Sequence, residues 1–255
     1  MTAPSGPIPV VIIGASGRMG LSLLRLLPQF PQLRLQAAVV GDASQSLGRD
    51  TGELAGMAAS GVSASTDLES ALRGAALALD FSTAAAAPGQ VTMCAAAGIP
   101  LLLGTTGLGP DMPSIIARAS ERIPLLVAAN TSLGAAVLQD LVRRAAAALP
   151  TGFDIQVQDT HHRHKKDAPS GTALALGQAA LEGRGGSGRV EYASLRGGDA
   201  VGEHEVQFLG DGERLRLSHV VTDRAVFAQG ALQAGLWLMR QKPGTHHMAD
   251  IFKEK

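Results

Sequence analysis

Along the first half of the chain, short apolar runs rich in Val, Ile and Leu alternate with segments in which apolar residues recur at helical spacing. The apolar runs predict strands at residues 9–16, 33–42, 77–83, 100–107 and 124–130. The helical segments cover residues 18–30, 89–98 and 112–122. Strands that alternate with helices are typical of βαβ units, so residues 1–130 are predicted to form one α/β domain with a parallel sheet.

The pattern changes after Asn130. An Ala-rich helix is predicted at residues 133–150, and Ser170 is a good N-cap for a second helix. Alternation of polar and apolar residues, typical of strands with one buried face, is found at residues 153–162, 189–199 and 202–223. The "GDGE" stretch inside the last segment predicts a hairpin turn, and residues 225–241 return to helical spacing. We therefore predict a second, α+β domain with an antiparallel or mixed sheet that begins at residue 131.

The composition narrows the classes of function. The chain has 255 residues, with 22 basic and 22 acidic side chains and a formal net charge of zero, which argues against a nucleic-acid partner. Cys94 is the one cysteine, so no internal disulfide can form, and its apolar surroundings indicate a buried residue. The sequence has no signal-like start and no run of about 18 apolar residues, so we expect a cytoplasmic protein without a membrane partner.

The loop after the first predicted strand has glycines at three-residue spacing. In "GASGRMG", Gly14 permits a tight turn, Gly17 lets the backbone approach a pyrophosphate, and Gly20 lets the helix pack on the strand. The pyrophosphate would lie at the N-terminus of the helix that follows. A tight turn without a ligand is the alternative. Arg18 lies inside the loop, and Asp42 is the nearest carboxylate after the second strand.

Two later strand ends carry small polar residues, in "GTTG" at residues 104–107 and "AANTS" at residues 128–132. Ligands bind open α/β sheets at the carboxyl ends of the strands, so both are candidates for the nicotinamide side, although ordinary turns have similar sequences. The cofactor is predicted to be NADH or NADPH. The predicted cofactor-binding residues are Gly14, Ala15, Ser16, Gly17, Arg18, Met19, Asp42, Gly104, Thr105, Thr106, Ala128, Ala129, Asn130 and Thr131.

Six consecutive residues, His161 to Lys166, are all histidine, lysine or arginine, and the helix capped by Ser170 follows them. Helix N-terminal N–H groups together with Lys and His side chains can hold carboxylates or phosphates, and histidine can transfer a proton near neutral pH. Three interpretations stay open: a catalytic site for a small acidic substrate, a metal site built from histidines, and a solvated strand edge. The interleaved Arg and Lys disfavour a metal, and none is predicted.

Together these segments resemble one family. "GASGRMG", "DFST", "GTTG", "AAN", "DTHHRHKKDAPSGTALALG", "VGEHEVQF" and "GERLRLSH" are similar to motifs of 4-hydroxy-tetrahydrodipicolinate reductase (dihydrodipicolinate reductase), in the family's order from about Val10 to Ile251. The resemblance implies a Rossmann-like cofactor domain (1–130), a substrate-binding and oligomerisation domain (131–223) and a C-terminal segment (224–255) that returns to the first domain. It also implies a homotetramer and a role in lysine and diaminopimelate biosynthesis.

The reaction implied by the resemblance is the NAD(P)H-dependent reduction of a cyclic dicarboxylate, 4-hydroxy-tetrahydrodipicolinate, with loss of water. Carried over by position, His161 is a proton donor and acceptor, Lys165 is a proton donor, and His162, Gly171 and Thr172 hold the substrate carboxylates. Where many members have Glu-Arg after the second strand, this chain has Val40 and Gly41, which leaves the choice of dinucleotide open. Another two-domain dehydrogenase and a catalytically inactive dinucleotide-binding regulator are the alternatives.

Overall fold

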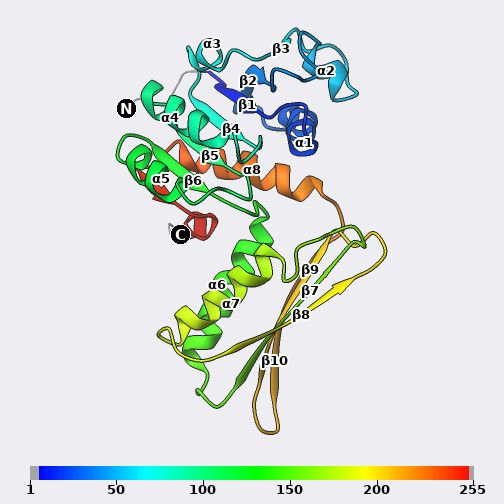
Figure 1. Cartoon of the computed structure of the whole chain (residues 1–255), viewed down its shortest axis with the longest axis vertical. Coiled ribbons are helices and arrows are strands. Elements are labelled where there is room, and N and C mark those ends of the chain that lie inside the picture. Colours follow the sequence, from blue (N-terminus) through cyan, green and yellow to red (C-terminus); the bar gives the residue numbers. More distant parts are fainter. Residues whose placement is uncertain (1–5, 253–255) are drawn as a thin grey trace. The chain divides into compact units, whose positions relative to one another are not determined.

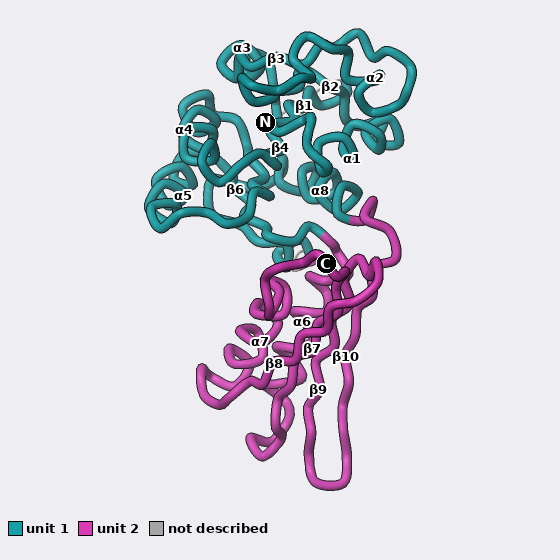
Figure 2. Tube along the Cα trace, turned by 45° about the vertical axis from the view of Figure 1, so that its right-hand side comes forward, with its two compact units in different colours: residues 1–131, 227–251 teal, residues 132–226, 252–255 magenta. Residues whose placement is uncertain are grey.

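The protein is described by a computed structural model, in which residues 6–252 are placed and form two compact units (Figures 1 and 2). Unit 1 comprises residues 1–131 and 227–251, and unit 2 comprises residues 132–226 and 252–255. Residues 1–5 and 253–255, which open the first predicted domain and close the predicted C-terminal segment, lie outside the described residues.

Unit 1 is built on a parallel sheet, as predicted. The neighbouring strands, in spatial order, are β11 (Gly244–His246), β6 (Pro124–Val127), β5 (Leu101–Leu103), β4 (Leu77–Asp80), β1 (Ile8–Ile13), β2 (Leu33–Val39) and β3 (Ala64–Ser65). The central strands are almost wholly apolar and buried, because helices cover a parallel sheet on both faces (Figure 1).

The described part of unit 1 has a helical segment at each position predicted for one, and three short ones besides. They are α1 (Arg18–Leu26), η1 (Leu27–Gln29), α2 (Thr51–Leu54), α3 (Leu68–Leu72), α4 (Ala87–Ala97), α5 (Met112–Ser120), most of α8 (Ala225–Leu238) and most of η2 (Met248–Phe252). Gly98 ends α4 in the left-handed conformation, with φ of 69°, as is common for a glycine after a helix. Cys94 on this helix is fully buried among the apolar side chains, which confirms its predicted place in the core.

Five elements in the described part of unit 1 were not predicted: α2, β3, α3, β11 and η2, most of which belongs to this unit. Each is five residues or shorter, and β3 and β11 are the two edge strands of the sheet. A strand of two or three residues is too short to display a period of two. Pairing with β6 defines β11, and pairing with β2 defines β3, so these strands exist through tertiary contacts and not through a local pattern.

Unit 2 contains a four-stranded mixed sheet, which confirms the predicted class. The order is β10 (Arg214–Val221), β9 (Gly202–Leu209), β7 (Asp154–His161) and β8 (Val190–Arg196). β7 pairs parallel with β8 and antiparallel with β9, and the predicted hairpin joins β9 to β10, with the Gly210 N–H donating to the Glu213 carbonyl at 3.0 Å. Helices α6 (Leu133–Ala148) and α7 (Gly171–Gly183) lie side by side over one face of this sheet (Figure 1).

The helix-covered face of this sheet is apolar at one end of its strands and polar at the other. At one end, Ile155 and Val157 of β7 lie opposite Phe208 and Val206 of β9, and all four are buried in an apolar core. Since side chains alternate between faces, the next positions on this face of β7 are two and four residues further on. They are occupied by the polar residues Asp159 and His161, which are also buried. A core strand that turns polar at one end therefore brings buried ionisable groups together.

Candidate active site

The glycine loop of unit 1 has the shape that a dinucleotide site needs. Gly14 has φ of 80°, and a Cβ atom there would lie 2.5 Å from the Phe81 carbonyl oxygen. A Cβ atom on Gly20 would lie 2.3 Å from the Gly14 carbonyl oxygen, and one on Gly17 would lie 3.2 Å from the same atom. The loop therefore folds closely over the end of β1, and all three positions disfavour a side chain.

Helix α1 begins directly after this loop with Gly17 at its N-cap. No described side chain caps this helix end, and its first turn holds no acidic residue. The first N–H groups of a helix lack acceptors within the helix, and its dipole favours negative charge there. The loop and the helix end together fit the pyrophosphate of a dinucleotide, so Ala15, Ser16, Arg18 and Met19 stay candidate contacts.

The ends of β4 and β5 form the next part of this sheet edge. Thr105 is 6% exposed, and its hydroxyl donates to Asp80 Oδ1 at 3.2 Å, so its side chain is already engaged. A Cβ atom on Gly104 would lie 2.2 Å from the Phe81 ring, so this glycine leaves space for that ring. Phe81 thus contacts both the Gly14 loop and the "GTTG" segment, which the sequence patterns did not reveal. Thr106 is exposed.

Asp80 is a buried carboxylate in the middle of this edge. Its Oδ1 also accepts the Ser82 N–H at 2.8 Å, whereas its Oδ2 is buried without a hydrogen-bond partner among the described residues. Burial raises the pKa of Asp80, although the hydrogen bonds from Ser82 and Thr105 oppose the rise. Burial, and next the charge of Asp80, raises the pKa of the nearby Cys94 thiol to about 12, so this cysteine is not a nucleophile near neutral pH.

The remaining predicted cofactor residues have different surroundings. Ala128, Ala129 and Asn130 follow β6 at the same sheet edge, whereas Thr131 is 2% exposed and its hydroxyl donates to the Phe227 carbonyl at 2.6 Å. Its side chain therefore binds the backbone of α8. Arg18 and Asp42 are both exposed, and the loop that carries Asp42 approaches the glycine loop through Ser44 and Ser16, whose hydroxyls lie 3.3 Å apart.

In unit 2, the predicted catalytic histidine is held by a buried carboxylate. His161 Nδ1 lies 2.8 Å from Asp159 Oδ2, and Arg196 Nη1 lies 2.9 Å from the same oxygen. Asp159 Oδ1 accepts the Ser194 hydroxyl at 2.6 Å and the Ser170 N–H at 3.4 Å. An ionised carboxylate only accepts, so His161 donates from Nδ1 and its Nε2 is left for other partners.

Two opposing effects act on each member of this pair. Burial lowers the pKa of His161, while the hydrogen bond to Asp159 raises it and the charge of Lys165 lowers it again; the net direction is down. Burial raises the pKa of Asp159, but the hydrogen bonds from Ser194, Arg196 and His161 outweigh burial and lower it. The geometry therefore favours an ionised carboxylate behind an imidazole that is readily deprotonated.

A second buried histidine links His161 to the N-terminus of α7. The rings of His161 and His204 meet edge to face with centroids 5.2 Å apart. His204 Nε2 lies 3.2 Å from the Ser170 hydroxyl, which accepts the Ala173 N–H at 3.2 Å and so caps the helix, as predicted. Burial, and next the charge of His161, lowers the pKa of His204 to about 4, so this ring is neutral at physiological pH.

The predicted anion-binding residues lie at the start of the same helix. Gly171 and Thr172 are the first two residues of α7, where N–H groups have no acceptor within the helix. The Ser170 cap joins this helix end to Asp159 and His204. The described structure thus brings His161, Gly171 and Thr172 to one end of unit 2.

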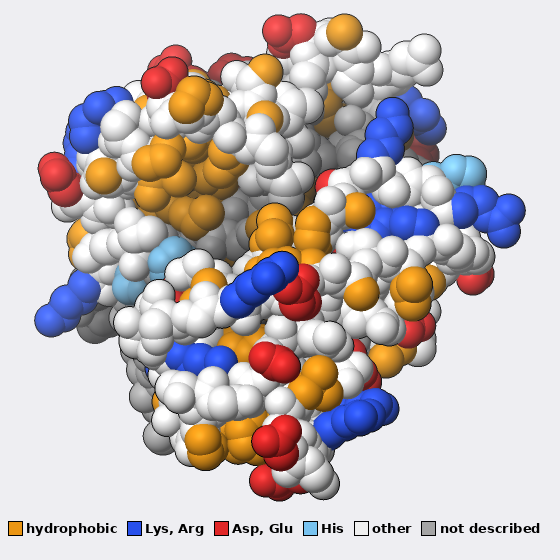
Figure 3. All heavy atoms as spheres, turned by 60° about the horizontal axis from the view of Figure 1, so that its bottom comes forward, with side chains coloured by type: hydrophobic (Ala, Val, Ile, Leu, Met, Phe, Trp, Pro, Cys, Tyr) orange, Lys and Arg blue, Asp and Glu red, His pale blue; other side chains and the backbone are white. Residues whose placement is uncertain are grey.

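The other basic residues of the cluster have different surroundings. Lys165 Nζ pairs with Asp167 Oδ1 at 2.8 Å, yet its charge still acts on His161. An open depression of about 690 Å³ in unit 2 is lined by His162, Arg163, His164, Gly198, Asp199 and Arg224. On the face drawn in Figure 3, Lys and Arg side chains lie among acidic and apolar ones and do not form one broad basic surface.

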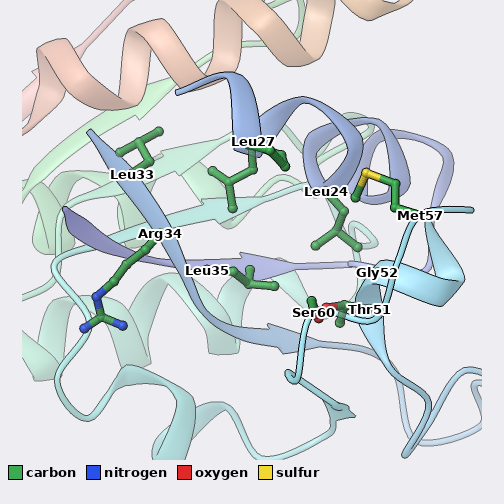
Figure 4. A pocket seen from close by; sticks show the side chains of 10 residues that line it. Leu24, Leu27, Leu33, Arg34, Leu35, Thr51, Gly52, Met57 and Ser60 are labelled. Atoms are coloured by element: carbon green, nitrogen blue, oxygen red, sulfur yellow. Dashed lines mark hydrogen bonds between the residues drawn. The ribbon is translucent and has the colours of Figure 1, made fainter. Parts of the chain in front are cut away.

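Three further observations concern metal binding, membrane insertion and an apolar cavity. Within residues 6–252, no group of three or more His, Cys, Asp and Glu side chains could hold a metal ion, and no helix is long and apolar enough to cross a membrane. Unit 1 also has an apolar cavity of about 210 Å³ between α1, β2 and the segment around Thr51 (Figure 4). Leu24, Leu27, Leu33, Leu35 and Met57 line most of it, and it contains none of the predicted cofactor-binding residues.

Comparison with known proteins decides the family. The sequence model described as "Dihydrodipicolinate reductase, N-terminus" matches residues 8–131, and the one described as "Dihydrodipicolinate reductase, C-terminus" matches residues 134–252. The chain belongs to the dihydrodipicolinate reductase family. The resemblance seen in the sequence motifs is thereby confirmed over nearly the whole length.

Individual relatives agree with this family. The 4-hydroxy-tetrahydrodipicolinate reductase of Bradyrhizobium diazoefficiens is 43% identical over 95% of this chain and 96% of its own length. That of Anaeromyxobacter dehalogenans is 41% identical with the same coverage. Among solved structures, a dipicolinate-bound dihydrodipicolinate reductase from Paenisporosarcina sp. TG-14 superimposes with a TM-score of 0.78 at 21% identity, covering 94% of this chain and 97% of that one.

Proteins with other names share the fold alone. An amine dehydrogenase from Mycobacterium smegmatis superimposes with a TM-score of 0.64 at 13% identity, covering 96% of each chain. Fold similarity at this identity carries no information on the substrate. The family assignment therefore depends on the sequence matches and not on the overall architecture.

The sequence reasoning missed Asp159, Arg196 and His204, although a signal was present. Asp159 and His161 continue the buried alternation of Ile155 and Val157, so polar residues occupy positions where the pattern expects apolar ones. Polar residues at core positions of a strand are costly unless they are hydrogen-bonded, and they often mark a site. The partners across the sheet, His204 opposite Asp159 and Arg196 opposite His161, required knowledge of the register.

Proposed function

We propose that the protein is an NAD(P)H-dependent 4-hydroxy-tetrahydrodipicolinate reductase that acts in lysine and diaminopimelate biosynthesis. It reduces the cyclic dicarboxylate to tetrahydrodipicolinate with loss of water. Membership of the family supports this reaction. The structural observation that supports it most is the polar end of unit 2, where a carboxylate-bound imidazole lies beside a helix N-terminus.

We propose that unit 1 binds the dinucleotide. The loop and helix end at Gly14–Met19 would hold the pyrophosphate, and the segments 104–106 and 128–131, which end strands at the same sheet edge, would line the nicotinamide side. Asp42 and Arg18 are the candidates at the adenosine ribose, since an acidic residue binds a free 2′-hydroxyl and an arginine a 2′-phosphate. When bound, the dinucleotide supplies the two electrons of the reduction.

We propose that unit 2 binds the substrate and handles the protons. The N–H groups of Gly171 and Thr172 and the side chain of His162 bind the two carboxylates, because a helix N-terminus and a cationic side chain both favour anions. His161 exchanges a proton at Nε2, since Asp159 engages Nδ1. Lys165 donates a second proton and adds positive charge. A dianionic substrate accounts for the gathering of basic residues between His161 and Lys166.

We also propose a homotetramer and a cytoplasmic location. The face of the four-stranded sheet that α6 and α7 do not cover includes the exposed apolar residues Leu195 and Val220, which are 52% and 57% exposed. Exposed apolar residues on an uncovered sheet support association through this face. Sedimentation equilibrium would give four times the chain mass for a tetramer, and a monomer mass at micromolar concentration would exclude it.

The function is tested by an assay with several substrates. Pyruvate and aspartate semialdehyde are condensed by the preceding synthase, and oxidation of NADH or NADPH is followed by absorbance. We expect oxidation to depend on the synthase product. Open-chain 2-oxo acids and sugar acids should give none. Turnover of those compounds instead would favour another two-domain dehydrogenase, and dinucleotide binding without any turnover would favour a regulator.

A further inference from the structure

The least expected group at the site is Asp159, a carboxylate at a core position of β7. Its side chain is fully buried, and each of its oxygens has two partners. The four partners come from three elements of unit 2: His161 on its own strand, Ser194 and Arg196 on β8, and the Ser170 peptide at the start of α7. Burial of a charged carboxylate is costly, so this set of contacts needs a reason beyond packing.

One oxygen of Asp159 contacts the residue proposed for proton exchange, and the other contacts the helix end proposed for anion binding. Oδ2 accepts from His161 Nδ1, the far side of the imidazole that exchanges a proton. Oδ1 accepts from the Ser170 N–H, which belongs to the N-cap of the helix whose next two residues, Gly171 and Thr172, bind the anion. One carboxylate therefore contacts both the proton-transfer group and the anion-binding helix end.

We propose that Asp159 is a positioning residue, which fixes the tautomer and direction of the His161 imidazole and aligns the start of α7 with it. The inference rests on the proposed function, in which His161 exchanges the proton and α7 binds the carboxylates. Asp159 does not contact the substrate in this account; it acts through His161 and Ser170. Arg196 and Ser194 keep the carboxylate ionised and fixed in direction.

The charged neighbours set the expected direction of a pH effect. Lys165 and Arg196 lower the pKa of His161, Asp159 raises it, and the neutral ring of His204 packs against it from β9. Removal of the Asp159 charge takes away the group that raises the pKa of His161, while Lys165 and Arg196 still lower it, so the pKa of His161 must fall. An opposite charge at hydrogen-bond distance typically changes a pKa by about 1–3.

The first measurement needs no turnover and no change to Asp159. In protein labelled with ¹⁵N in its histidines, the ring nitrogen shifts of His161 report which nitrogen carries the proton in the neutral form, and the His161→Gln spectrum assigns the signals. Asp159 predicts a proton on Nδ1. A neutral His161 protonated on Nε2 would overturn the proposal, whether or not the protein proves to be the reductase.

The second measurement uses Asp159→Asn, which keeps the size and removes the charge, beside Ser194→Ala, which removes a hydrogen bond to the other oxygen without touching the imidazole. We expect Asp159→Asn to lower the His161 pKa by about one pH unit or more and kcat/KM by about tenfold to a hundredfold. The fall of kcat/KM at high pH, where the proton donor is lost, should move to lower pH by the same amount.

Two further variants, Ser194→Ala and Asp159→Glu, distinguish an effect on the position of His161 from an effect on folding. Ser194→Ala should leave the midpoint of the pH profile in place, and Asp159→Glu should restore part of kcat/KM because it restores the charge. If Asp159→Asn lowers kcat/KM at every pH with an unchanged midpoint, the residue is merely structural and the proposal is wrong. Failure of the unchanged protein to reduce the substrate would refute the proposed function and leave the titration result standing.

Discussion

Substitution of Gly202 by alanine tests how the approach to His161 is kept open. Gly202 is the first residue of β9 and is buried beside the two histidines. A Cβ atom there would lie 3.2 Å from His161 Nε2 and 3.7 Å from His204 Cε1. Because Nδ1 is bound to Asp159, the ring cannot turn away without losing that bond. The added methyl group therefore crowds the nitrogen that we propose to exchange a proton.

The expected effects on stability and on catalysis differ in size. Alanine in place of glycine within a strand stabilises by about 0.5–1 kcal/mol, while overpacking costs about 1–3 kcal/mol when the overlap is severe. A contact of 3.2 Å is tight but not severe, so the two terms nearly cancel and unfolding should change by less than about 1 kcal/mol. Misplacement of a reacting group by about 1 Å can cost a hundredfold in rate, so we expect kcat/KM to fall about tenfold to a hundredfold.

The assay is steady-state oxidation of NAD(P)H with the synthase-generated substrate, together with thermal unfolding. Gly152→Ala is the matched control, since Gly152 lies in unit 2 and a Cβ atom there would have no described atom within 4 Å. Unchanged unfolding with reduced kcat/KM in Gly202→Ala alone would support the reasoning. A Gly202→Ala variant with the kcat/KM of the unchanged protein would show that this side of Nε2 is not used.

Four further outcomes follow from the same geometry. His161→Ala should lower kcat about 10²–10⁴-fold, and a nearly normal kcat would remove it from the mechanism. Lys165→Ala should impair both kcat and KM, with weaker competition by pyridine-2,6-dicarboxylate; unchanged inhibition would remove it from carboxylate binding. NADH and NADPH should give kcat/KM values within about tenfold to thirtyfold of each other, and Asp42→Ala should shift the preference towards NADPH. A preference above about a thousandfold would mean that another residue distinguishes the 2′-hydroxyl from the 2′-phosphate of the ribose. Folding lowers the pKa of His204 from 6.5 to about 4. Between these values the unfolded chain binds a proton that the folded protein does not, so the free energy of unfolding should fall by about 3 kcal/mol as the pH falls from 6.5 to 4. His204→Gln should therefore lose less stability than the unchanged protein between pH 7 and pH 4, by urea unfolding, and equal losses would contradict burial of a neutral ring.

Much of the fold follows from periodicity. The strands of unit 1 are continuous apolar runs and those of unit 2 alternate, which predicts one parallel sheet and one antiparallel or mixed sheet. The edge strands β3 and β11 could not be predicted, because their existence depends on neighbours distant in sequence. The helices α2 and α3 are only four and five residues long, so they show no helical period, although Asp50 and Asp67 cap them locally. The edge strands are stabilised by pairing with β2 and β6, and neither shows a period of its own.

The site was predictable where chemistry and spacing coincide in one segment. The glycine loop and the residues from His161 to Thr172 are of this kind. Arg196 and His204 were not predictable, because their contacts with Asp159 and Ser170 arise from the register of three strands. The bond from the Thr131 hydroxyl to the backbone of Phe227 was not predictable either, because it joins residues 96 positions apart in the sequence.

The central claim, that this chain reduces the cyclic dicarboxylate, is tested most directly by stoichiometry. A limiting, known amount of aspartate semialdehyde is converted by the synthase with excess pyruvate, and the protein is then added with excess NADPH or NADH. The account predicts that one dinucleotide is oxidised per aspartate semialdehyde, and that the His161→Ala variant reaches the same end point far more slowly. No oxidation of either dinucleotide, under conditions where the Bradyrhizobium diazoefficiens relative reaches the end point, would contradict it.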